Sequence, residues 1–354
     1  MMDIERLRGE IDKIDSQILE LLTERANKAL EIARIKRKKG ESYYSPGRER
    51  IIIDRLLSQN KGPIPNEELE QIIRSIIQAC LSLQKKLKVV YFGPPATFTH
   101  LAAIRNFGQS AELIPAKNIS QIFAMVEKKK ADYGVVPVEN STEGMVSHTL
   151  DMFLDSDLKI CAEVILEIAH HLLGKGKLGE IEKIYSHPQA IAQCRNWLEE
   201  NMPSVEICEV ESTARAAQLA SEDEKAGAIA SEVAAGLYGL NILESHIEDF
   251  SHNYTRFLVI GRDYVEKSGQ DKTSILFSIK DRVGALYDML APFRIHGINL
   301  TKIESRPTKK KAWEYVFFVD FLGHKDDDPV KKALSELEEQ CFFLKILGSY
   351  PRGD

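Results

Sequence analysis

The N-terminal segment of the chain constrains its fold more than any other stretch. Between residues 4 and 35, apolar side chains recur at steps of three and four positions, with one glycine and no proline. This spacing gathers them on one face of a single amphipathic helix of unusual length. We expect the helix to end near Gly40.

Two shorter helices are expected to follow. One begins around Arg48, and the other runs from Asn66, its predicted N-cap, to Leu87. Three helices of which one is so long make a poor core for a single chain. We therefore expect residues 1–87 to form an all-α domain that is completed in a homodimer of interlocked helices. The sequence leaves open whether such dimers pair into a homotetramer.

Positive charges on the long helix are the first candidates for a binding site. Arg25 and Lys36 are 11 residues apart, which returns them to nearly the same face, whereas Arg8 precedes Arg25 by 17 residues. That separation is roughly 25 Å along a helix axis, more than a small metabolite can span. A site that uses Arg8 must therefore be completed by a second chain. The alternative is that all three are solvated helix charges.

These residues, with Glu24, the segment 48–50 and Gln84, resemble the all-helical chorismate mutases. The resemblance implies a Claisen rearrangement of chorismate to prephenate. Such a reaction needs no nucleophile or proton transfer, so catalysis comes from holding a flexible dianion and stabilising the charge that develops on its ether oxygen.

The same resemblance assigns roles within the mutase site. Arg25, Arg48 and the Arg8 of a second chain would hold carboxylates, because the guanidinium fork binds both oxygens. Lys36 and Gln84 would contact the ether oxygen, and Glu49 the ring hydroxyl. Two positions depart from the family pattern: Ser45 stands where an Asp is common, and Cys80 occupies a Ser-like position. Neither is a cation, so we expect altered affinity and retained chemistry.

The central segment, residues 88–265, repeats one pattern: an apolar strand, a short loop ending in a hydroxyl residue, then a helix. The predicted strands are 89–92, 133–136, 184–185, 207–210 and 228–230. This alternation predicts an α/β domain with a largely parallel sheet. Each Ser or Thr is taken alone as a helix cap. Together, capped helix N-termini along one sheet edge would suit carboxylate ligands.

Five motifs in this segment resemble the prephenate dehydratases. They are Gly93-Pro94 with 97–99, 137–141 with Gly144, 186–189, Ser212-Thr213, and 253–257. The resemblance implies two lobes arranged as in periplasmic binding proteins, with the substrate in the cleft between them. The reaction expels the ring hydroxyl and CO2 from prephenate and yields phenylpyruvate, which requires a proton donor at the hydroxyl and a dry cleft.

The dehydratase resemblance also nominates site residues. Thr255 is the expected hydrogen-bond donor, at the edge of a strand over 257–260, and Arg256 or a helix cap would hold the side-chain carboxylate. Glu139 and Asn140 would orient the hydroxyl, and His187 is either a second acid or an ordinary loop histidine. The full predicted set for prephenate is Thr97, Glu139, Asn140, Ser141, Ser186, His187, Gln189, Ser212, Thr213, Asn253, Thr255, Arg256 and Phe257.

Ala96 departs from the dehydratase pattern, since the family usually has Gly there. If the backbone at this position requires positive φ, an alanine would be strained.

The C-terminal segment, residues 271–350, has a different order of elements. Strands are expected over 273–279, 299–305, 313–321 and 342–347, with helices over 284–296 and 328–340. This βαββαβ order is a ferredoxin-like α+β unit. Its motifs resemble the ACT regulatory domain, which implies phenylalanine as an allosteric effector, bound near Gly284, Ala285, Leu286, Glu304, Ser305, Arg306 and Pro307. The basic run 309–311 is expected to be a solvated turn.

Composition sets the remaining bounds. A net charge of -6 over 354 residues offers no electrostatic footprint for nucleic acid. No apolar run approaches the ~20 residues of a membrane span, so a cytoplasmic location is expected. The five cysteines are scattered and are expected to be reduced thiols. The adjacent pair His170 and His171 lacks the spacing of a metal site, and we predict neither a metal nor a cofactor.

Nearly the whole chain thus resembles a bifunctional family of phenylalanine biosynthesis that joins chorismate mutase to prephenate dehydratase, with feedback by phenylalanine. Two alternatives remain at this point. The chain is either a dehydratase whose helices serve only for dimerisation, or an amino-acid sensor without catalytic activity.

Overall fold

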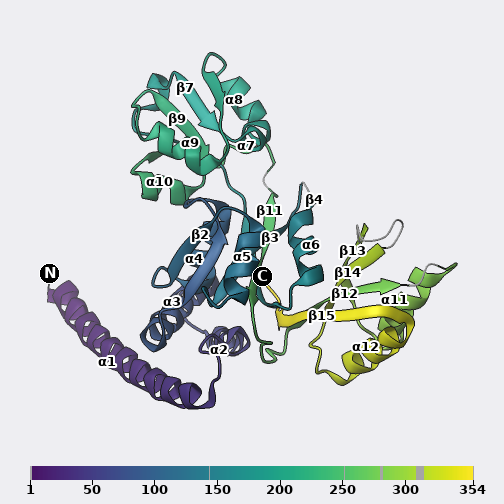
Figure 1. Ribbon diagram of the computed structural model, residues 1–354. Helices are drawn as coiled ribbons and strands as arrows, with labels where there is room; N and C mark the ends of the chain where they lie inside the picture. The colour runs from purple at the N-terminus through teal and green to yellow at the C-terminus, as the bar shows by residue number, and fades with distance from the viewer. Residues whose placement is uncertain (1, 143, 251, 280–281, 308–314, 354) are drawn as a thin grey trace.

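The computed structural model describes residues 2–142, 144–250, 252–279, 282–307 and 315–353. Figure 1 shows three parts: a helical arm at the N-terminus, a two-lobed α/β region, and a sheet with two helices at the C-terminal side. Three separate sheets carry the strands, two of them in the central region and one in the C-terminal region.

The helical part consists of α1 (Met2–Lys39), α2 (Pro46–Gln59) and α3 (Asn66–Gln84). α1 ends as predicted before Gly40, whose φ of 70° is the left-handed conformation of a helix C-terminus. The predicted N-cap of α3 was wrong. Pro65 occupies the cap position because its carbonyl accepts from the amide of Leu69, and Asn66 is already helical.

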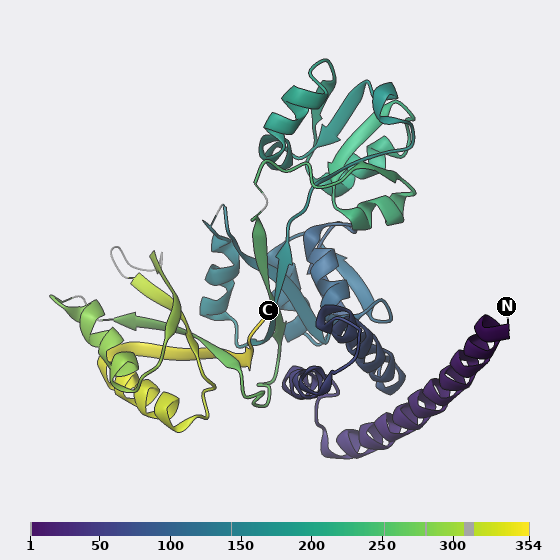
Figure 2. The same cartoon turned by 180° about the vertical axis from the view of Figure 1, so that it is seen from behind.

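α1 reaches well beyond the rest of the molecule, as both views show (Figures 1 and 2). The buried core of the helical part is small and consists of Ile53, Ile73 and Ile77. Along α1, by contrast, large apolar side chains are solvent-exposed: Ile4, Leu7, Ile11, Ile14, Ile18, Leu21, Ile32 and Ile35. Their regular spacing makes a continuous apolar face that the described residues leave exposed to solvent.

The first lobe is built on a sheet of order β2-β1-β3-β11-β5, with β4 paired to β3. Its strands are β1 (Lys88–Phe92), β2 (Glu112–Ala116), β3 (Tyr133–Asn140), β4 (Gly144–Met145), β5 (Lys159–Glu167) and β11 (Tyr254–Gly261). Helices α4 (Phe98–Phe107), α5 (Ile119–Glu127) and α6 (Ser147–Asp155) belong to this lobe. Two buried apolar clusters share its strands. One of them continues into the C-terminal sheet through Leu276, Phe318 and Leu347, and the other includes Tyr44 and Leu81 of the helical part.

The second lobe is inserted between β5 and β11, on a sheet of order β10-β6-β9-β7-β8. Its strands are β6 (His171–Gly174), β7 (Lys183–Ser186), β8 (Glu206–Glu209), β9 (Ala226–Ala230) and β10 (Asn241–Glu244). Its helices are η1 (Leu178–Glu180), α7 (Pro188–Gln193), α8 (Arg195–Asn201), α9 (Thr213–Ala220) and α10 (Glu232–Tyr238). Figure 1 shows this lobe above the first, joined to it by two crossing segments.

The five strands predicted in this region are all present, but the expectation of a largely parallel sheet was wrong. β1 runs parallel to β2 and β3, and β7 runs parallel to β8 and β9. β11 is antiparallel to both β3 and β5, and β6 is antiparallel to β9 and β10. In the first sheet the reason is that the chain passes to the second lobe after β5 and returns in β11. The returning strand therefore runs opposite to its neighbours.

The C-terminal part has the predicted βαββαβ order, in a sheet of order β13-β14-β12-β15. Its elements are β12 (Asp271–Ile279), α11 (Ala285–Ile295), β13 (Leu300–Pro307), β14 (Tyr315–Leu322), α12 (Asp328–Gln340) and β15 (Cys341–Pro351). The predicted basic turn 309–311 lies outside the described residues. β15 continues past its predicted end and reaches β5, where a Cβ on Gly348 would collide with the backbone carbonyl of Ile160.

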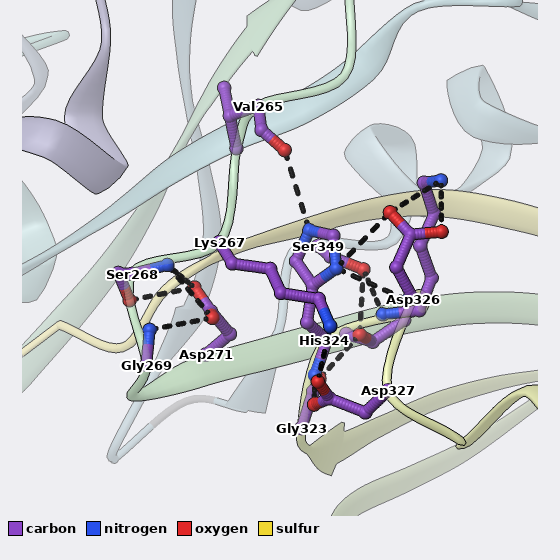
Figure 3. Close-up of polar contacts among 12 residues, drawn as sticks. Val265, Lys267, Ser268, Gly269, Asp271, Gly323, His324, Asp326, Asp327 and Ser349 are labelled. Carbon is purple, nitrogen blue, oxygen red and sulfur yellow. Dashed lines mark hydrogen bonds and ion pairs between the residues drawn. The ribbon is translucent and has the colours of Figure 1, made fainter. Parts of the chain in front are cut away.

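A polar cluster holds the linker between the central and C-terminal parts (Figure 3). The backbone amides of Ser268 and Gly269 donate to the carboxylate of Asp271, at 3.0 and 3.1 Å. The Lys267 ammonium lies 2.7 Å from Asp327, whose carboxylate also accepts from the amide of His324. These contacts bind the linker to the C-terminal sheet at several points.

Candidate functional sites

A cavity of about 280 Å³ lies among the three N-terminal helices. It brings together Arg25, Lys36, Arg48, Glu49 and Gln84, which are the predicted mutase residues of one chain. Ser45 and Cys80, the two departures from the family pattern, also line it. Lys28 and Tyr43 line the cavity but were not predicted; Lys28 could have been found because it lies one helical turn after Arg25.

Arg8 is not among the residues that line this cavity, and its side chain is solvent-exposed near the far end of α1. Within the cavity, the Lys36 ammonium donates to the carbonyl of Ser42 at 2.9 Å, which holds it at the end of its helix. Burial raises the pKa of Glu49 from its usual 4.5 to about 7, although the charges of Arg74 and Lys36 act in the opposite direction.

A larger cavity of about 780 Å³ lies between the two lobes of the central region. Both lobes and both crossing segments contribute to its wall. The predicted prephenate residues that line it are Thr97, Asn140, His187, Gln189, Ser212, Thr213, Asn253, Thr255 and Phe257. Residues separated by more than 150 positions in the sequence therefore share one wall.

Helix N-termini contribute to this cavity, as the sequence pattern suggested. Thr97 caps α4 by accepting from the amide of His100, and Ser212 caps α9 by accepting from the amide of Arg215. At α7 the cap is His187, whose Nδ1 accepts from the amide of Gln189. Ser186 is buried instead, and its hydroxyl donates to the carbonyl of Ile229 at 2.8 Å.

Thr255 is the second residue of β11, one position inside the start of the strand. It lies opposite Asn140 of β3. The Asn140 side-chain amide donates to Thr255 Oγ1 at 2.8 Å. Since successive side chains of a strand face opposite sides of the sheet, Thr255 and Phe257 line the cavity while Arg256 faces away. The oxygen of Thr255 is thus engaged as an acceptor at the cavity wall.

Arg256 contacts the C-terminal part of the molecule. Its guanidinium reaches Glu163 at 2.7 Å, Asp320 at 2.5 Å and the Tyr350 hydroxyl at 2.9 Å. Both carboxylates are almost completely buried, and Lys272 lies 2.7 Å from Glu163. Arg256 is therefore the centre of a buried network of charges between β11 and the C-terminal sheet.

Glu139 and Ser141 likewise do not line the cavity. Glu139, the register partner of Arg256, pairs with Lys302 of β13. The Ser141 hydroxyl donates to the carbonyl of His252 and accepts from the amide of Tyr254. Glu139, Ser141, Ser186 and Arg256 are thus the predicted prephenate residues that do not line the cavity.

Other residues of the cavity wall were not predicted. They include His170, Gln193, Arg215, Gln218 and Tyr238. Arg215 could have been predicted from the sequence, because it lies in the first turn of the helix capped by Ser212. His170 and Gln193 could not, since their place in the wall depends on how the crossing segments pair.

Ala96 has a φ of 68° and is completely buried. The positive φ that the family's glycine suggested is therefore present, and an alanine adopts it. Its carbonyl accepts from the hydroxyl of Ser231 at 3.2 Å, and its methyl joins the alanine-rich core of the second lobe. The loop of the first lobe is thus held against the second.

The predicted effector residues lie at one end of the C-terminal sheet. Ser278, Val316 and Arg306 form a row across β12, β14 and β13, which places the segments 284–286 and 304–307 at the same end. Gly284 has a φ of 78°, and Leu286 is 39% exposed. The Arg306 guanidinium lies 3.3 Å from Asp151 of α6.

Among the described residues, no three His, Cys, Asp or Glu side chains gather closely enough to bind a metal ion. In the same part of the chain, no helix combines the length and apolar character needed to cross a membrane.

Three family models match the chain: chorismate mutase type II over residues 7–85, prephenate dehydratase over 89–265, and the ACT domain over 273–339. A bifunctional chorismate mutase/prephenate dehydratase of Aquifex aeolicus is 56% identical over 99% of both chains. The enzyme of the same description from Pseudomonas aeruginosa is 45% identical over 99% of this chain and 98% of its own.

A solved structure, the prephenate dehydratase of Arthrobacter aurescens in complex with L-Phe, superimposes with a TM-score of 0.69. It is 35% identical, and the match covers 75% of this chain and 90% of that one.

The three matched domains define a multidomain enzyme with an ACT domain attached to its catalytic parts. More specifically, the chain belongs to the family of bifunctional chorismate mutase/prephenate dehydratases, and it carries one domain of each kind.

Proposed function

We propose that residues 1–87 convert chorismate to prephenate, that residues 88–265 convert prephenate to phenylpyruvate, and that residues 271–350 bind phenylalanine as a feedback effector. The ranges of the three family models support these boundaries, since their gaps fall at the same joints. Both reactions would take place in the cytoplasm, consistent with small soluble substrates.

The mutase proposal rests on five predicted side chains that line one cavity. Arg25 and Arg48 hold the two carboxylates of chorismate in a reactive conformation. Lys36 and Gln84 stabilise the negative charge on the ether oxygen as its bond to carbon breaks. Glu49 contacts the ring hydroxyl, and its raised pKa keeps part of the population uncharged near pH 7, which limits repulsion with the dianion.

We further propose that the mutase site is completed by the Arg8 of a second chain in a homodimer. The exposed apolar face of α1 supports this, because leaving so many large apolar residues in water is unfavourable. The distance of roughly 25 Å between Arg8 and Arg25 on one helix excludes a shared ligand within one chain.

The dehydratase proposal is carried by one observation: Thr255 lines the interlobe cavity with its oxygen already accepting from Asn140. A hydroxyl has one hydrogen and two lone pairs, so the hydrogen is left for an acceptor in the cavity. Thr255 donates a hydrogen bond through it to the ring hydroxyl of prephenate as that group departs with the electrons of the C–O bond, and the hydroxide takes up a proton from solvent. The electron pair of the breaking C–CO2 bond completes the aromatic ring.

The surroundings of Thr255 suit this reaction. The amides at the N-termini of α4 and α9 bind carboxylate oxygens through neutral groups. Phe92, Phe98 and Phe257 line the same cavity and exclude water. A wall with few full charges does not over-stabilise the carboxylate that must be lost. Arg215 is the guanidinium in this wall, and we assign it to the side-chain carboxylate in place of Arg256.

Replacement of Thr255 tests this assignment. Thr255→Val keeps the shape of the side chain and removes the donor, so dehydration should fall by at least ~100-fold. Mutase activity of the same sample should stay within about twofold and serves as the control for folding. Retained dehydration would assign proton donation to another group, with His187 the first to examine.

Feedback by phenylalanine can reach the interlobe cavity through the contacts of β3 and β11 with the ACT domain. Thr255 and Asn140 face the cavity, while their strand neighbours Arg256 and Glu139 are bound to the ACT domain. A shift of β13 or β14 on effector binding would therefore act on the strands that carry the donor. Lys302→Gln, which weakens only the Glu139 contact, should reduce inhibition by phenylalanine with little change in the uninhibited rate. Unchanged inhibition would contradict this route.

A further inference from the structure

Five side chains of the interlobe cavity form an unbroken hydrogen-bonded chain that ends at Thr255. His170 Nε2 lies 2.7 Å from Gln193 Oε1, and Asn253 Nδ2 donates to the same oxygen at 3.3 Å. Asn140 Nδ2 donates to both Asn253 Oδ1 and Thr255 Oγ1, each at 2.8 Å. The chain crosses from α7 of the second lobe, through both crossing segments, to β3 and β11 of the first.

The direction of every bond in this chain is set by one backbone group. The amide N–H of Thr142 donates to Asn140 Oδ1 at 3.0 Å, and a backbone N–H can only donate. The Asn140 amide therefore cannot be reversed, and its NH2 must face Asn253 and Thr255. Asn253 then presents its own NH2 to Gln193, so the Gln193 oxygen faces both neighbours.

An oxygen at that position requires a donor on His170. The Gln193 oxygen already accepts from Asn253, and a bond to the imidazole forms only if Nε2 carries the hydrogen. Burial lowers the pKa of His170, although the bond to Gln193 and the charge of Glu248 oppose this shift. The ring is then neutral, with hydrogen on Nε2 and none on Nδ1. Consistently, no described residue forms a hydrogen bond with Nδ1, which is buried.

The histidine is also held rigidly in place. Its side chain is only 2% exposed, and the ring of Phe98 packs edge-on against it. Its backbone amide donates to Glu248 at 2.8 Å, and its carbonyl accepts from the amide of Ile247 at 2.9 Å. The carbonyl of Gln193 accepts from the amide of Asp249 at 2.7 Å. Both residues are thus anchored to the second crossing segment.

We infer that His170 and Gln193 are positioning residues that keep the Thr255 hydroxyl polarised as a donor toward the cavity. If the amides of the chain were reversed, Asn140 would accept the threonine hydrogen, and Thr255 would offer the substrate only a lone pair. The Thr142 amide excludes that arrangement, and His170 closes the chain at its far end with the donor that the remaining direction requires. This inference rests on the proposed role of Thr255.

The tautomer of His170 can be measured independently of catalysis. The full-length enzyme labelled with 15N in its histidines is observed by NMR at neutral pH, and His170→Phe identifies the resonances. We expect a neutral ring with a protonated Nε2 and a bare Nδ1. A ring protonated at Nδ1, or at both nitrogens, overturns the inference.

Kinetics of two Gln193 variants provide the second measurement. Gln193→Glu keeps an acceptor for both His170 and Asn253, whereas Gln193→Met keeps the length and removes it. We expect Gln193→Met to lower the kcat of dehydration by about tenfold with KM nearly unchanged, and Gln193→Glu to stay within about threefold of the original rate. Equal losses in the two variants, or no loss in either, overturn the inference. Unchanged mutase activity shows that each variant is folded.

The two proposals fail in different ways. If Thr255→Val retains dehydration, the role of Thr255 is lost whatever the tautomer of His170. If Thr255→Val abolishes dehydration while His170 carries its hydrogen on Nδ1, only the positioning inference is lost.

Discussion

The two cavities that we assign to the mutase and to the dehydratase are built in opposite ways. The mutase cavity lies among three helices with a small buried core, and its predicted Arg8 is far away on an exposed arm. The dehydratase cavity lies between two lobes whose strands and helices pack into large buried apolar clusters. Three helices suffice to bring charged side chains together at one cavity. A cavity walled on both sides by a single chain needs two packed lobes.

The charges that line the two cavities also differ. Four cationic side chains, Arg25, Lys28, Lys36 and Arg48, line the smaller cavity. The larger one is lined mainly by neutral donors and apolar rings. A rearrangement that keeps both carboxylates benefits from full positive charges, whereas a reaction that expels a carboxylate is slowed by them. The kind of wall in each cavity therefore fits the reaction that we propose for it.

Lys36→Ala is expected to produce the largest difference between the mutase and dehydratase activities. Removing the cation at the ether oxygen should lower mutase turnover by about 10²–10³-fold and leave dehydration unchanged. Lys38→Ala, an exposed lysine at the end of the same helix, is the matched control. Unchanged mutase turnover in Lys36→Ala would leave the helices as a dimerisation module alone.

Mixing two inactive variants tests whether one site is shared between chains. Arg8→Ala and Arg25→Ala should each lose most mutase activity. Random exchange of subunits gives mixed dimers in half of the population, each with one intact site, so about a quarter of the original activity should return. Dehydratase activity should be constant throughout. A mixture no more active than its parts would place Arg8 outside the site.

The pH dependence of the mutase should be set by Glu49. Its carboxyl ionises near pH 7 in the folded enzyme, so mutase kcat/KM should fall as pH rises through this value, because a new negative charge faces the dianion. A pKa raised by folding also means that its contribution to stability is largest below pH 4.5 and is lost as pH rises to about 7. Glu49→Gln should flatten both profiles, and Glu338→Gln, an exposed glutamate of α12, should change neither. A fall in kcat/KM that survives in Glu49→Gln would belong to another group.

Ala96→Gly should have the smallest effect and tests how the two lobes are held together. Glycine removes left-handed strain of about 1–2 kcal/mol, but it costs about 0.5–1 kcal/mol in chain entropy and about 0.8 kcal/mol in lost methyl burial. These nearly cancel, so we expect the free energy of unfolding to change by less than about 1 kcal/mol, measured in urea. A larger loss would show that the methyl group in the alanine-rich core dominates.

Much of this enzyme could be predicted from local patterns. The long helix α1, the predicted strands of the central region and the βαββαβ order of the ACT domain followed from periodicity and turn residues, and the structure has them, although it also has β2, β4, β5, β6 and β10, which were not predicted. Similarly, the cations of the mutase cavity share one helix or begin the next, so helical geometry alone brings them together.

The tertiary structure decided which way the residues of β3 and β11 face. Thr255 and Arg256 are neighbours, and the sequence predicted that both bind the substrate. In the sheet, however, Thr255 faces the cavity and Arg256 faces the ACT domain. The same pairing turns Asn140 inward and Glu139 outward. Helix patterns are local and can be read along the chain. By contrast, the face of a central strand depends on what packs on each side of its sheet, and that is settled only when distant segments meet.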